Sequence, residues 1–436
     1  MNHRIRIEKI VTGGFGLARL PDGLVVLTRY VIPGETVLVR EVARHRGYIE
    51  ALPVEIIDSP QNRAAPPCPY FTACGGCDFQ HIEISSQHHI KTEMIRESLQ
   101  RAGVAADNSV VHPLLPSPLP YGYRFRIRLQ AGPEGQLGFF RTGSNDLVPV
   151  SRCLLATDPI NRALRELRSS DTFSKIAADI SEIELLQNPA DNRVVAVLHL
   201  HRKAKAKTSQ FSAFAVTLET ISDLVIKKGK KISSPVPGAS PVLLQQDFDS
   251  SICGRSFSLS WSPGCFFQVN VPHNRNLIAQ VCREYVRTGR GRTVLDLYCG
   301  MGNFSIPIAL CGAEVTGIEH NPESIKWSVF NARQAGLDRC SFLADDVGRR
   351  LQDFLSRSQG FEVILVDPPR QGLGKHTPLL AALKPETIIY VSCDPATLAR
   401  DLAALTKSGY RISSLTPVDM FPQTHHIESV ALLEKN

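Results

Sequence analysis

The 436-residue sequence lacks the long apolar runs of a membrane protein. No stretch approaches the roughly 18 apolar residues of a membrane span, and the N-terminus, MNHRIRIEKIVTGG, has no apolar stretch before a cleavage site, as a secretory signal would. Wholesale disorder is not indicated either, because 43% of the residues are hydrophobic and 21% are charged. We expect a soluble, cytoplasmic protein with no membrane partner, and at about 150 residues per domain its length predicts two or three domains.

The sequence also has little excess charge and an odd number of cysteines. Lys plus Arg exceeds Asp plus Glu by 49 − 42 = 7, a mild basic excess that is compatible with a polyanionic partner but no proof of one. Eleven cysteines cannot all pair, so a closed disulfide framework would leave one thiol over. The cysteines of a cytoplasmic protein therefore need individual explanations.

Residues 1–59 have the pattern of a small β domain. Short alternating segments are separated by the turns GG, PDG and PG. This spacing predicts an RNA-binding β-barrel of the OB type, whose shallow face often binds single-stranded nucleic acid; any other small β domain is the alternative. The predicted strands are Ile5–Ile10, Leu24–Thr28, Thr36–Arg40 and Ala51–Ile57.

Residues 60–262 predict a central α+β domain. A stretch rich in Pro, Gly and Cys at 60–80 precedes a predicted helix at 87–102, a proline-rich connector at 113–122 and a second helix around 160–168. The predicted strands are Arg124–Gln130, Arg193–His201 and Ser256–Trp261. Two lysine clusters are either solvated loops or RNA contacts. They are Lys203, Lys205 and Lys207, and Lys227, Lys228, Lys230 and Lys231.

Residues 263–436 alternate strands and helices at the spacing of a parallel, doubly wound α/β sheet. The predicted strands are Thr293–Tyr298, Glu314–Glu319, Glu362–Val366 and Thr387–Val391, with a helix from Pro322. Two late strands, 410–418 and 427–434, are separated by only eight residues. That is too few for a parallel crossover, so they predict an antiparallel hairpin at the sheet edge.

The motif Cys68-x5-Cys74-x2-Cys77 is the strongest local signal in the N-terminal half. Three thiolates with Gly75-Gly76 between them, which let the backbone wrap closely, predict one face of a metal centre. Zn²⁺ or a [4Fe–4S] cluster needs a fourth ligand, and Cys153 is the best candidate. The spacing alone does not separate zinc from iron–sulfur, and three unligated thiols are the remaining alternative.

The segment VLDLYCGMGNF predicts a nucleoside-binding turn between a strand and a helix. Gly300-Met-Gly302 lets a ligand approach the backbone at the carboxyl end of the strand that contains Asp296. Glu319 ends the next strand, where a carboxylate can bind ribose hydroxyls. Because the third glycine of a dinucleotide fingerprint is missing, S-adenosylmethionine fits this turn better than NAD.

Three further polar positions follow or begin apolar strands. Asp367, in Asp-Pro-Pro-Arg, places a carboxylate and rigid backbone at the strand end, unless the motif is a plain turn. Cys393 lies between a strand and a helix, where the helix dipole would favour a nucleophilic thiolate; a buried structural thiol is the alternative. Glu428 is either a general base or a surface glutamate.

Together these motifs closely resemble the RNA (uracil-C5)-methyltransferases, in particular the iron–sulfur branch that acts on 23S ribosomal RNA. The resemblance covers essentially the whole chain. It implies an N-terminal TRAM barrel and a Rossmann-like methyltransferase domain of the S-adenosylmethionine-dependent class. The motifs that carry it are GGFGLARLPDG, CPYFTACGGC, SPGCFFQVN, LDLYCGMGNF, DPPRQG, SCDPATLARDL and DMFPQTHHIES.

The resemblance also implies roles for individual residues. Cys393 matches the family's nucleophile and Glu428 its base. The family's [4Fe–4S] ligands fall on Cys68, Cys74, Cys77 and Cys153, and its S-adenosylmethionine contacts on Gln268, Tyr298, Asn303, Glu319, Asp346 and Asp367. Tyr298 stands where the family often has Phe.

These roles fit one chemistry, and three alternatives to it remain. Uracil C5 is a weak carbon nucleophile until a thiolate adds to C6, and a base must later remove the C5 proton. The expected activity is 23S ribosomal RNA uridine-C5 methylation by a monomer. The alternatives are a transfer-RNA methyltransferase, a non-catalytic RNA-binding or ribosome-assembly factor, and a redox enzyme that uses the cluster.

Overall fold

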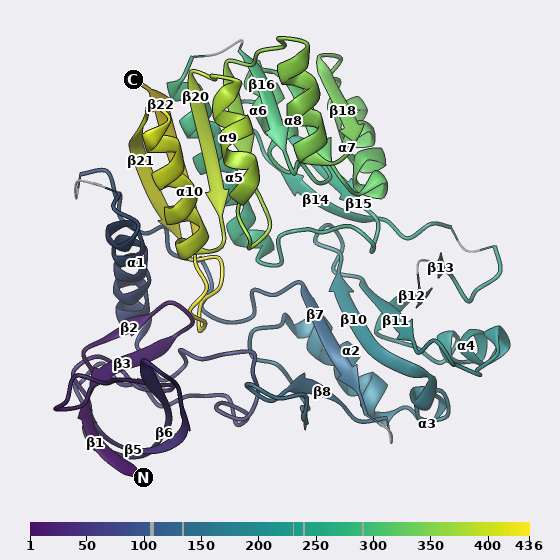
Figure 1. Ribbon diagram of the computed structural model, residues 1–436. Helices are drawn as coiled ribbons and strands as arrows, with labels where there is room; N and C mark the ends of the chain where they lie inside the picture. Colours follow the sequence, from purple (N-terminus) through teal and green to yellow (C-terminus); the bar gives the residue numbers. More distant parts are fainter. Residues whose placement is uncertain (105–108, 133–134, 230, 239, 290–291) are drawn as a thin grey trace.

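The computed structural model describes residues 1–104, 109–132, 135–229, 231–238, 240–289 and 292–436. Within these residues the strands form one six-stranded sheet, two seven-stranded sheets and a two-stranded hairpin. Figure 1 shows the N-terminal strands curled into a barrel at the lower left, an α+β domain at the lower right and the C-terminal α/β domain above both.

The N-terminal sheet has the strand order β1-β5-β6-β4-β3-β2. Its alternating apolar residues, including Val26, Val37 and Val39, fill the inside, as the barrel prediction requires. The sequence did not predict β3, because Gly16 interrupts its apolar pattern; a Cβ there would lie 2.3 Å from Cγ2 of Val31. The strands are β1 (Asn2–Arg6), β2 (Lys9–Val11), β3 (Phe15–Arg19), β4 (Val25–Thr28), β5 (Thr36–Arg44) and β6 (Tyr48–Asp58).

The central sheet has the order β13-β12-β11-β10-β7-β8-β9, and helices pack on one of its faces. The predicted helix at 160–168 is α2, which starts earlier because Asp158-Pro159 forms its first turn. The strands are β7 (Arg126–Ala131), β8 (Leu137–Phe140), β9 (Leu147–Pro149), β10 (Ile180–Gln187), β11 (Val194–Leu200), β12 (Ile221–Lys228) and β13 (Lys231–Ser233). The helices are α2 (Asp158–Ser169), α3 (Asp171–Ser174) and α4 (Thr208–Ala215).

The two lysine clusters lie next to each other at one end of this sheet. Lys228 Nζ donates to the carbonyl oxygen of Ala204, 3.3 Å away, beside the first cluster. Lys203, Lys205 and Lys207 are exposed, and Lys230 lies outside the described residues. The clusters therefore form one cationic end of the central domain.

The C-terminal sheet has the order β18-β17-β16-β19-β20-β22-β21. Its first five strands are parallel, and β22 runs antiparallel to both β20 and β21, which confirms the predicted hairpin. The order of the strands reverses between β16 and β19, the position at which doubly wound sheets bind ligands. The strands are β16 (Thr293–Leu297), β17 (Glu314–Glu319), β18 (Cys340–Ala344), β19 (Val363–Val366), β20 (Thr387–Ser392), β21 (Tyr410–Val418) and β22 (Glu428–Lys435).

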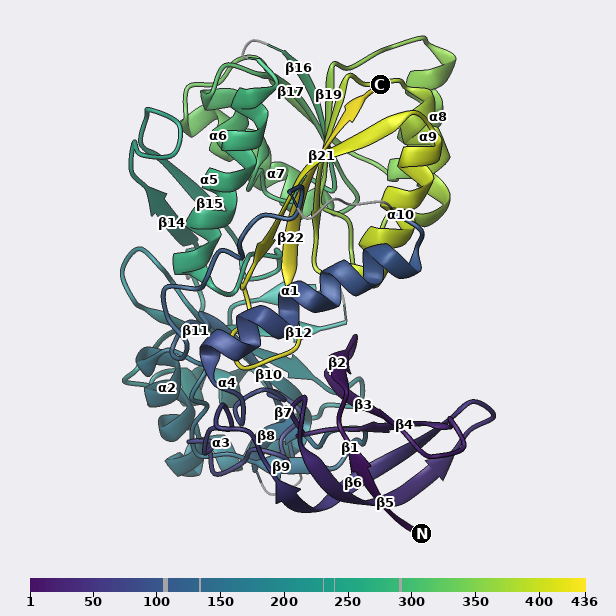
Figure 2. The same ribbon diagram turned by 90° about the vertical axis from the view of Figure 1, so that its left-hand side faces the viewer.

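Two layers of helices bury this sheet, as Figure 2 shows. The helices α5, α6 and α7 share a hydrophobic core with one face of the sheet, and α8, α9 and α10 share a second core with the other face. This three-layer arrangement confirms the predicted fold class. The helices are α5 (Val271–Arg287), α6 (Ser305–Leu310), α7 (Pro322–Gln334), α8 (Val347–Ser356), α9 (Thr377–Ala382) and α10 (Pro395–Lys407).

Two segments that precede residue 263 pack on the C-terminal domain. The helix α1 (Ile84–Arg101), predicted at 87–102, contacts α10, and its Ile95 and Leu99 join the same core. The hairpin of β14 (Leu244–Phe248) and β15 (Phe257–Trp261) packs on α7 and places Trp261 in the other core. The predicted domain division at 59/60 and 262/263 stays a prediction, and one hydrophobic core spans its second boundary.

Candidate active site

The predicted polar residues of the C-terminal domain lie at consecutive strand ends along one edge of the sheet. Because the first five strands are parallel and β22 is antiparallel, the carboxyl ends of the five and the start of β22 meet at this edge. In spatial order from β18 to β22, the residues at these ends are Asp346, Glu319, Tyr298, Asp367, Cys393 and Glu428. The fold thus brings together six positions that span 131 residues of sequence (428 − 298 + 1).

Cys393 and Glu428 are brought face to face by strand register. The ladder between β20 and β22 ends at the pair Ser392 and Ser429. Cys393 follows Ser392 and Glu428 precedes Ser429, so continuing this register would set the two residues opposite each other. Glu428 is 4% exposed, which excludes the surface-glutamate alternative. Its Oε2 is buried and has no hydrogen-bond partner among the residues that the structure describes. A buried carboxyl oxygen without a hydrogen-bond donor is unusual in a folded protein and is typical of a site where a substrate supplies the missing contact.

The charges around Cys393 oppose a thiolate in the free protein. Burial raises the pKa of this thiol to about 12, with Glu428 and Asp367 adding to the rise and Arg370 opposing it. The expectation that the helix dipole favours a thiolate is therefore wrong for the free protein. Asp394 caps α10 by accepting the Thr397 N–H at 2.8 Å, and its carboxylate also raises the pKa of the thiol.

Three carboxyl groups near this edge have raised pKa values. Burial raises the pKa of Asp367 to about 7 and that of Asp296 to about 8. The pKa of Glu428 lies well above its usual range because of burial and the nearby Asp367, against the opposing effect of Arg370. Carboxyl groups that stay protonated near neutral pH are typical of catalytic sites.

The glycine turn after β16 shapes the other half of the site. Tyr298 has a positive φ of 65°, a strained conformation for a non-glycine residue. A Cβ on Gly300 would meet no atom within 4 Å, so the turn faces open space there. The Gly300 N–H donates to Glu319 Oε2 at 3.3 Å, and the Asn321 N–H donates to Oε1 at 2.7 Å. The Glu319 carboxylate is thereby fixed beside this open space.

The remaining cofactor candidates surround the same turn. Asn303 exchanges two amide hydrogen bonds with Asn274 of α5, at 2.9 and 3.2 Å. Gln268 is buried in the loop before α5. Asp346 caps α8 by accepting the Arg349 N–H at 2.9 Å, and the phenol of Tyr298 lies 3.3 Å from Nδ1 of His376. Hydrogen bonds to neighbouring polar groups therefore fix the Asn303, Asp346 and Tyr298 side chains around the turn.

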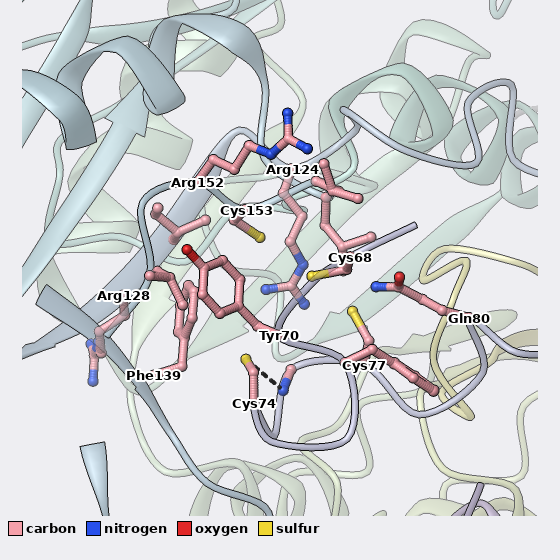
Figure 3. Close-up of a pocket in the computed structure, with 16 residues that line it drawn as sticks. Cys68, Tyr70, Cys74, Cys77, Gln80, Arg124, Arg128, Phe139, Arg152 and Cys153 are labelled. Atoms are coloured by element: carbon pink, nitrogen blue, oxygen red, sulfur yellow. Dashed lines mark hydrogen bonds between the residues drawn. The ribbon is translucent and has the colours of Figure 1, made fainter. Parts of the chain in front are cut away.

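The four predicted metal-ligating cysteines line one cavity of about 200 Å³. Figure 3 shows Cys68, Cys74 and Cys77 on one loop, Cys153 opposite them, and the Arg124 and Tyr70 side chains among the thiols. Among the described residues, no group of three or more His, Cys, Asp or Glu side chains has the geometry of a formed metal site. The protein without ligands thus gathers the four cysteines around one space but does not bring them into a metal-binding arrangement.

Hydrogen bonds and burial set the state of these thiols. Burial raises the pKa of Cys74 to about 11, and the Gly76 N–H, 3.4 Å from its Sγ, opposes the rise. Burial also raises the pKa of Cys77 and of Cys153. Asn161 of α2 fixes the Cys153 backbone by accepting its N–H at 2.8 Å and donating to its carbonyl oxygen at 2.9 Å. For Cys74, Cys77 and Cys153, burial therefore favours the neutral thiol.

Arg370 and His426, which the sequence did not predict as site residues, adjoin Cys393 and Glu428. The Arg370 guanidinium donates to His426 Nε2 at 3.4 Å. Both residues stand in motifs quoted above, DPPRQG and DMFPQTHHIES, and their polar character next to strand ends was the available signal. The cysteines without an assigned role are either buried or half-buried: Cys253, Cys265, Cys282, Cys299, Cys311 and Cys340.

Comparison with known proteins identifies the family. Residues 122–436, more than half of the chain, match a family model described as tRNA (Uracil-5-)-methyltransferase. The chain belongs to this family. It is 32% identical over 434 residues to the 23S rRNA (uracil(1939)-C(5))-methyltransferase RlmD of Shewanella sp. (strain ANA-3), covering 97% of this chain and 93% of the relative. The Acinetobacter baylyi protein of the same name is 31% identical over 99% of this chain and 96% of its own length.

A solved structure shares the fold over nearly the whole of this methyltransferase-family chain. The Pyrococcus abyssi tRNA (uracil-54, C5)-methyltransferase in complex with S-adenosyl-L-homocysteine has a TM-score of 0.72 and 23% identity. The alignment covers 99% of this chain and 100% of that one. Among the described residues, we find no helix with the length and apolar character to cross a membrane.

Proposed function

We propose that this protein methylates C5 of a uridine in 23S ribosomal RNA, with S-adenosylmethionine as the methyl donor. The observation that carries the proposal is the register that sets Cys393 opposite Glu428 at the carboxyl edge of a methyltransferase sheet. The RNA class comes from the curated relatives, whose names specify 23S rRNA. Ribosomal RNA as substrate implies a cytoplasmic location, and since one chain supplies both residues the reaction needs no second copy.

In the proposed reaction, Cys393 adds to uracil C6 and Glu428 later removes the C5 proton. The new S–C6 bond moves electron density to C5, which forms a bond to the methyl carbon of S-adenosylmethionine as the S–CH3 bond of the sulfonium breaks and S-adenosylhomocysteine leaves as the neutral thioether. Loss of the C5 proton to the carboxylate then restores the C5–C6 double bond and breaks the S–C6 bond. Because Arg370 lowers the pKa values of both groups, its guanidinium favours their reactive, charged forms.

The open glycine turn fits the methyl donor. Glu319 is held with its carboxylate beside Gly300 by two backbone N–H groups, a position suited to a ligand of ribose hydroxyls. Asp367 lies between this turn and Cys393 in the strand order. We assign the donor's binding to Gln268, Tyr298, Asn303, Glu319, Asp346 and Asp367.

We also propose that Cys68, Cys74, Cys77 and Cys153 hold a [4Fe–4S] cluster. The four thiols line one cavity, and the Gly76 N–H already points at Cys74 Sγ, an arrangement that stabilises a charged ligand sulfur. The methyl transfer needs no electron, so a cluster here would fold the central domain. Anaerobically purified protein should be brown and contain iron; a colourless protein with one zinc ion would reject the cluster.

The function is tested by giving the protein labelled S-adenosylmethionine with unmodified 23S ribosomal RNA and, separately, with transfer RNA. We expect 5-methyluridine at a single region of the ribosomal RNA. Label in transfer RNA alone would favour the transfer-RNA alternative, with which the family model's description and the Pyrococcus abyssi fold agree. Label in neither RNA would reject the enzyme and leave a non-catalytic RNA-binding factor.

A further inference from the structure

The loop of residues 419–427, between β21 and β22, connects the catalytic edge to the rest of the molecule. Figures 1 and 2 show it reaching from the C-terminal domain toward the barrel and the central domain. Its first half is anchored on α1: Lys91 Nζ pairs with Asp419, and the Gln423 N–H donates to Gln87 Oε1 at 2.9 Å. Its second half leads directly into Glu428, so whatever holds that half bears on the proposed base.

Asp78, next to Cys77, holds this second half. Its Oδ1 accepts the His425 N–H at 2.8 Å, and its Oδ2 pairs with the His425 ring nitrogen Nδ1. The backbone N–H groups of Asp78 and Phe79 donate to the Gln423 carbonyl oxygen at 3.2 and 3.0 Å. Four hydrogen bonds therefore join Asp78 and Phe79, at the end of the cysteine-rich segment, to the loop that leads into β22.

The barrel covers this contact from the other side. Arg29 Nη1 lies 3.8 Å from Asp78 Oδ2. The backbone of Gly14 approaches so closely that a Cβ there would lie 2.7 Å from Asp78 Oδ2 and 3.1 Å from His425 Cβ. Three parts of the chain thus meet at one carboxylate.

From His425 the contacts continue to the catalytic pair. The rings of His425 and His426 lie with their centroids 4.1 Å apart. Burial lowers the pKa of His426 to about 3, so its neutral ring can accept the Arg370 hydrogen bond at 3.4 Å. Arg370 is the cation that opposes the raised pKa values of both Cys393 and Glu428.

We propose that Asp78 is a positioning residue for the catalytic pair: through His425 and His426 it sets the place of Arg370 beside Cys393 and the orientation of Glu428. This inference rests on the proposed function for the roles of Cys393 and Glu428. On this proposal, the end of the cysteine-rich segment helps to position Glu428 as well as belonging to the central domain.

The first test uses no RNA. It measures the alkylation of Cys393 by iodoacetamide against pH, with the modified peptide identified by mass spectrometry. The charged groups that face this thiol are Glu428, Asp367, Asp394 and Arg370. Displacing the Arg370 cation raises the thiol pKa, so Asp78→Ala and His425→Ala should each slow alkylation at a fixed alkaline pH by about threefold or more.

Three variants separate positioning from folding. Asp78→Asn keeps an acceptor for the His425 N–H and should fall between wild type and Asp78→Ala. Gln87→Ala removes the contacts of α1 with Gln423 but leaves both bonds between Asp78 and His425, so it should lower the melting temperature and shift the alkylation profile less than Asp78→Ala does. Asp58→Ala removes an exposed carboxylate at the end of β6 and should change neither. An unshifted profile in both Asp78→Ala and His425→Ala would overturn the proposal.

The second test separates the two chemical steps. With ribosomal RNA carrying tritium at uridine C5, tritium release reports proton removal, and labelled methyl reports methyl transfer. A misplaced base should slow tritium release by about tenfold or more and leave a methylated protein–RNA adduct in Asp78→Ala. Equal losses of both rates would overturn the positioning of Glu428. If the wild-type chain shows neither reaction, the proposed function fails, whereas the alkylation profile still decides whether Asp78 positions Arg370.

Discussion

The two candidate sites differ in what holds their side chains in place. At the sheet edge, Cys393 and Glu428 are fixed by the ladder between β20 and β22. The cysteine cavity is built from turns: the Phe71 N–H donates to the Cys68 carbonyl oxygen at 3.1 Å, and the Gly75 N–H to that of Phe140 at 2.9 Å. The Cys393 and Glu428 site is part of a hydrogen-bonded sheet, whereas the cysteine cavity is formed by a loop that individual hydrogen bonds hold in place.

This difference bears on how each site is formed. Strand register places the catalytic pair, at the cost of buried carboxyl groups with raised pKa values. The cysteine loop gathers its thiols around a cavity, where burial raises the pKa values of Cys74 and Cys77, and the described residues form no metal-binding group of three or more ligands. Binding energy from a bound cluster would then contribute to the folding of this region.

The largest effect should come from Cys393→Ala. Removing the proposed nucleophile should lower methylation by more than about 10³-fold, because the bond from Cys393 to C6 is what makes C5 nucleophilic in the proposed reaction. The melting temperature should change little, since Cys393 lies at a strand end and is only half-buried. Cys340→Ala, at the opposite end of the sheet in β18, is the matched control and should keep its activity. Residual activity near wild type in Cys393→Ala would reject the mechanism.

Cys74→Ser and Cys153→Ser should have a large but local effect. Each removes one proposed ligand, so iron content and visible absorbance should fall together. Hydrogen exchange should speed up at residues 68–79, and through Asp78 at 419–427, while β16 to β20 keep their protection because sheet register does not depend on the cluster. The measurement is hydrogen exchange by mass spectrometry with iron analysis. Uniform loss of protection across the C-terminal sheet would show that the two sites are not independent.

Asn161→Ala should act in the same direction more weakly. This buried amide makes both hydrogen bonds that fix the Cys153 backbone, and its loss should reduce the free energy of unfolding by about 1–3 kcal/mol. The variant should retain less iron after dialysis against a chelator. Asn161→Asp keeps an acceptor for the Cys153 N–H but sets a carboxylate oxygen against the Cys153 carbonyl oxygen, so it should retain no more iron than the alanine variant. Unchanged iron retention in both variants would mean that α2 does not position Cys153.

Asp296→Asn should change how stability depends on pH. Burial raises the pKa of Asp296 from 3.8 to about 8, so the folded protein keeps a proton that the unfolded chain has released between these values. Stability therefore falls as the pH rises through this window. Asparagine does not titrate, so between pH 5 and pH 8 the variant should lose less stability than wild type, by about 1 kcal/mol or more. Denaturant melts at the two pH values measure this; parallel losses would contradict the raised pKa.

The fold was largely predictable because strand and helix periodicity is local. The hairpin followed from a loop too short for a crossover, and the common edge of Glu319 and Asp367 followed from parallel strands. The strand β3 was missed because Gly16 is required by the close approach of Val31 and carries no apolar signal. Features that depend on residues close together in the sequence, such as helices, strands and hairpins, could therefore be predicted.

The electrostatics and the link between the sites could not be predicted. The helix N-terminus at Cys393 is a local feature. The pKa of its thiol is raised first by burial and then by the carboxyl groups of Glu428 in β22 and Asp367 at the end of β19, all of which depend on tertiary packing. The contact between Asp78 and His425 joins residues 347 positions apart, both in loops, where no periodicity exists. Such contacts follow from how the domains pack, which a single sequence does not encode in any short pattern.

The central claim is that Cys393 and Glu428 act as nucleophile and base on one uridine. Glu428→Gln, incubated with labelled S-adenosylmethionine and unmodified 23S ribosomal RNA, tests it most directly. We expect a covalent protein–RNA adduct that survives denaturation, carries the labelled methyl group and maps to Cys393 by mass spectrometry. Release of free 5-methyluridine RNA at the wild-type rate, or an adduct on a different cysteine, would contradict the assignment.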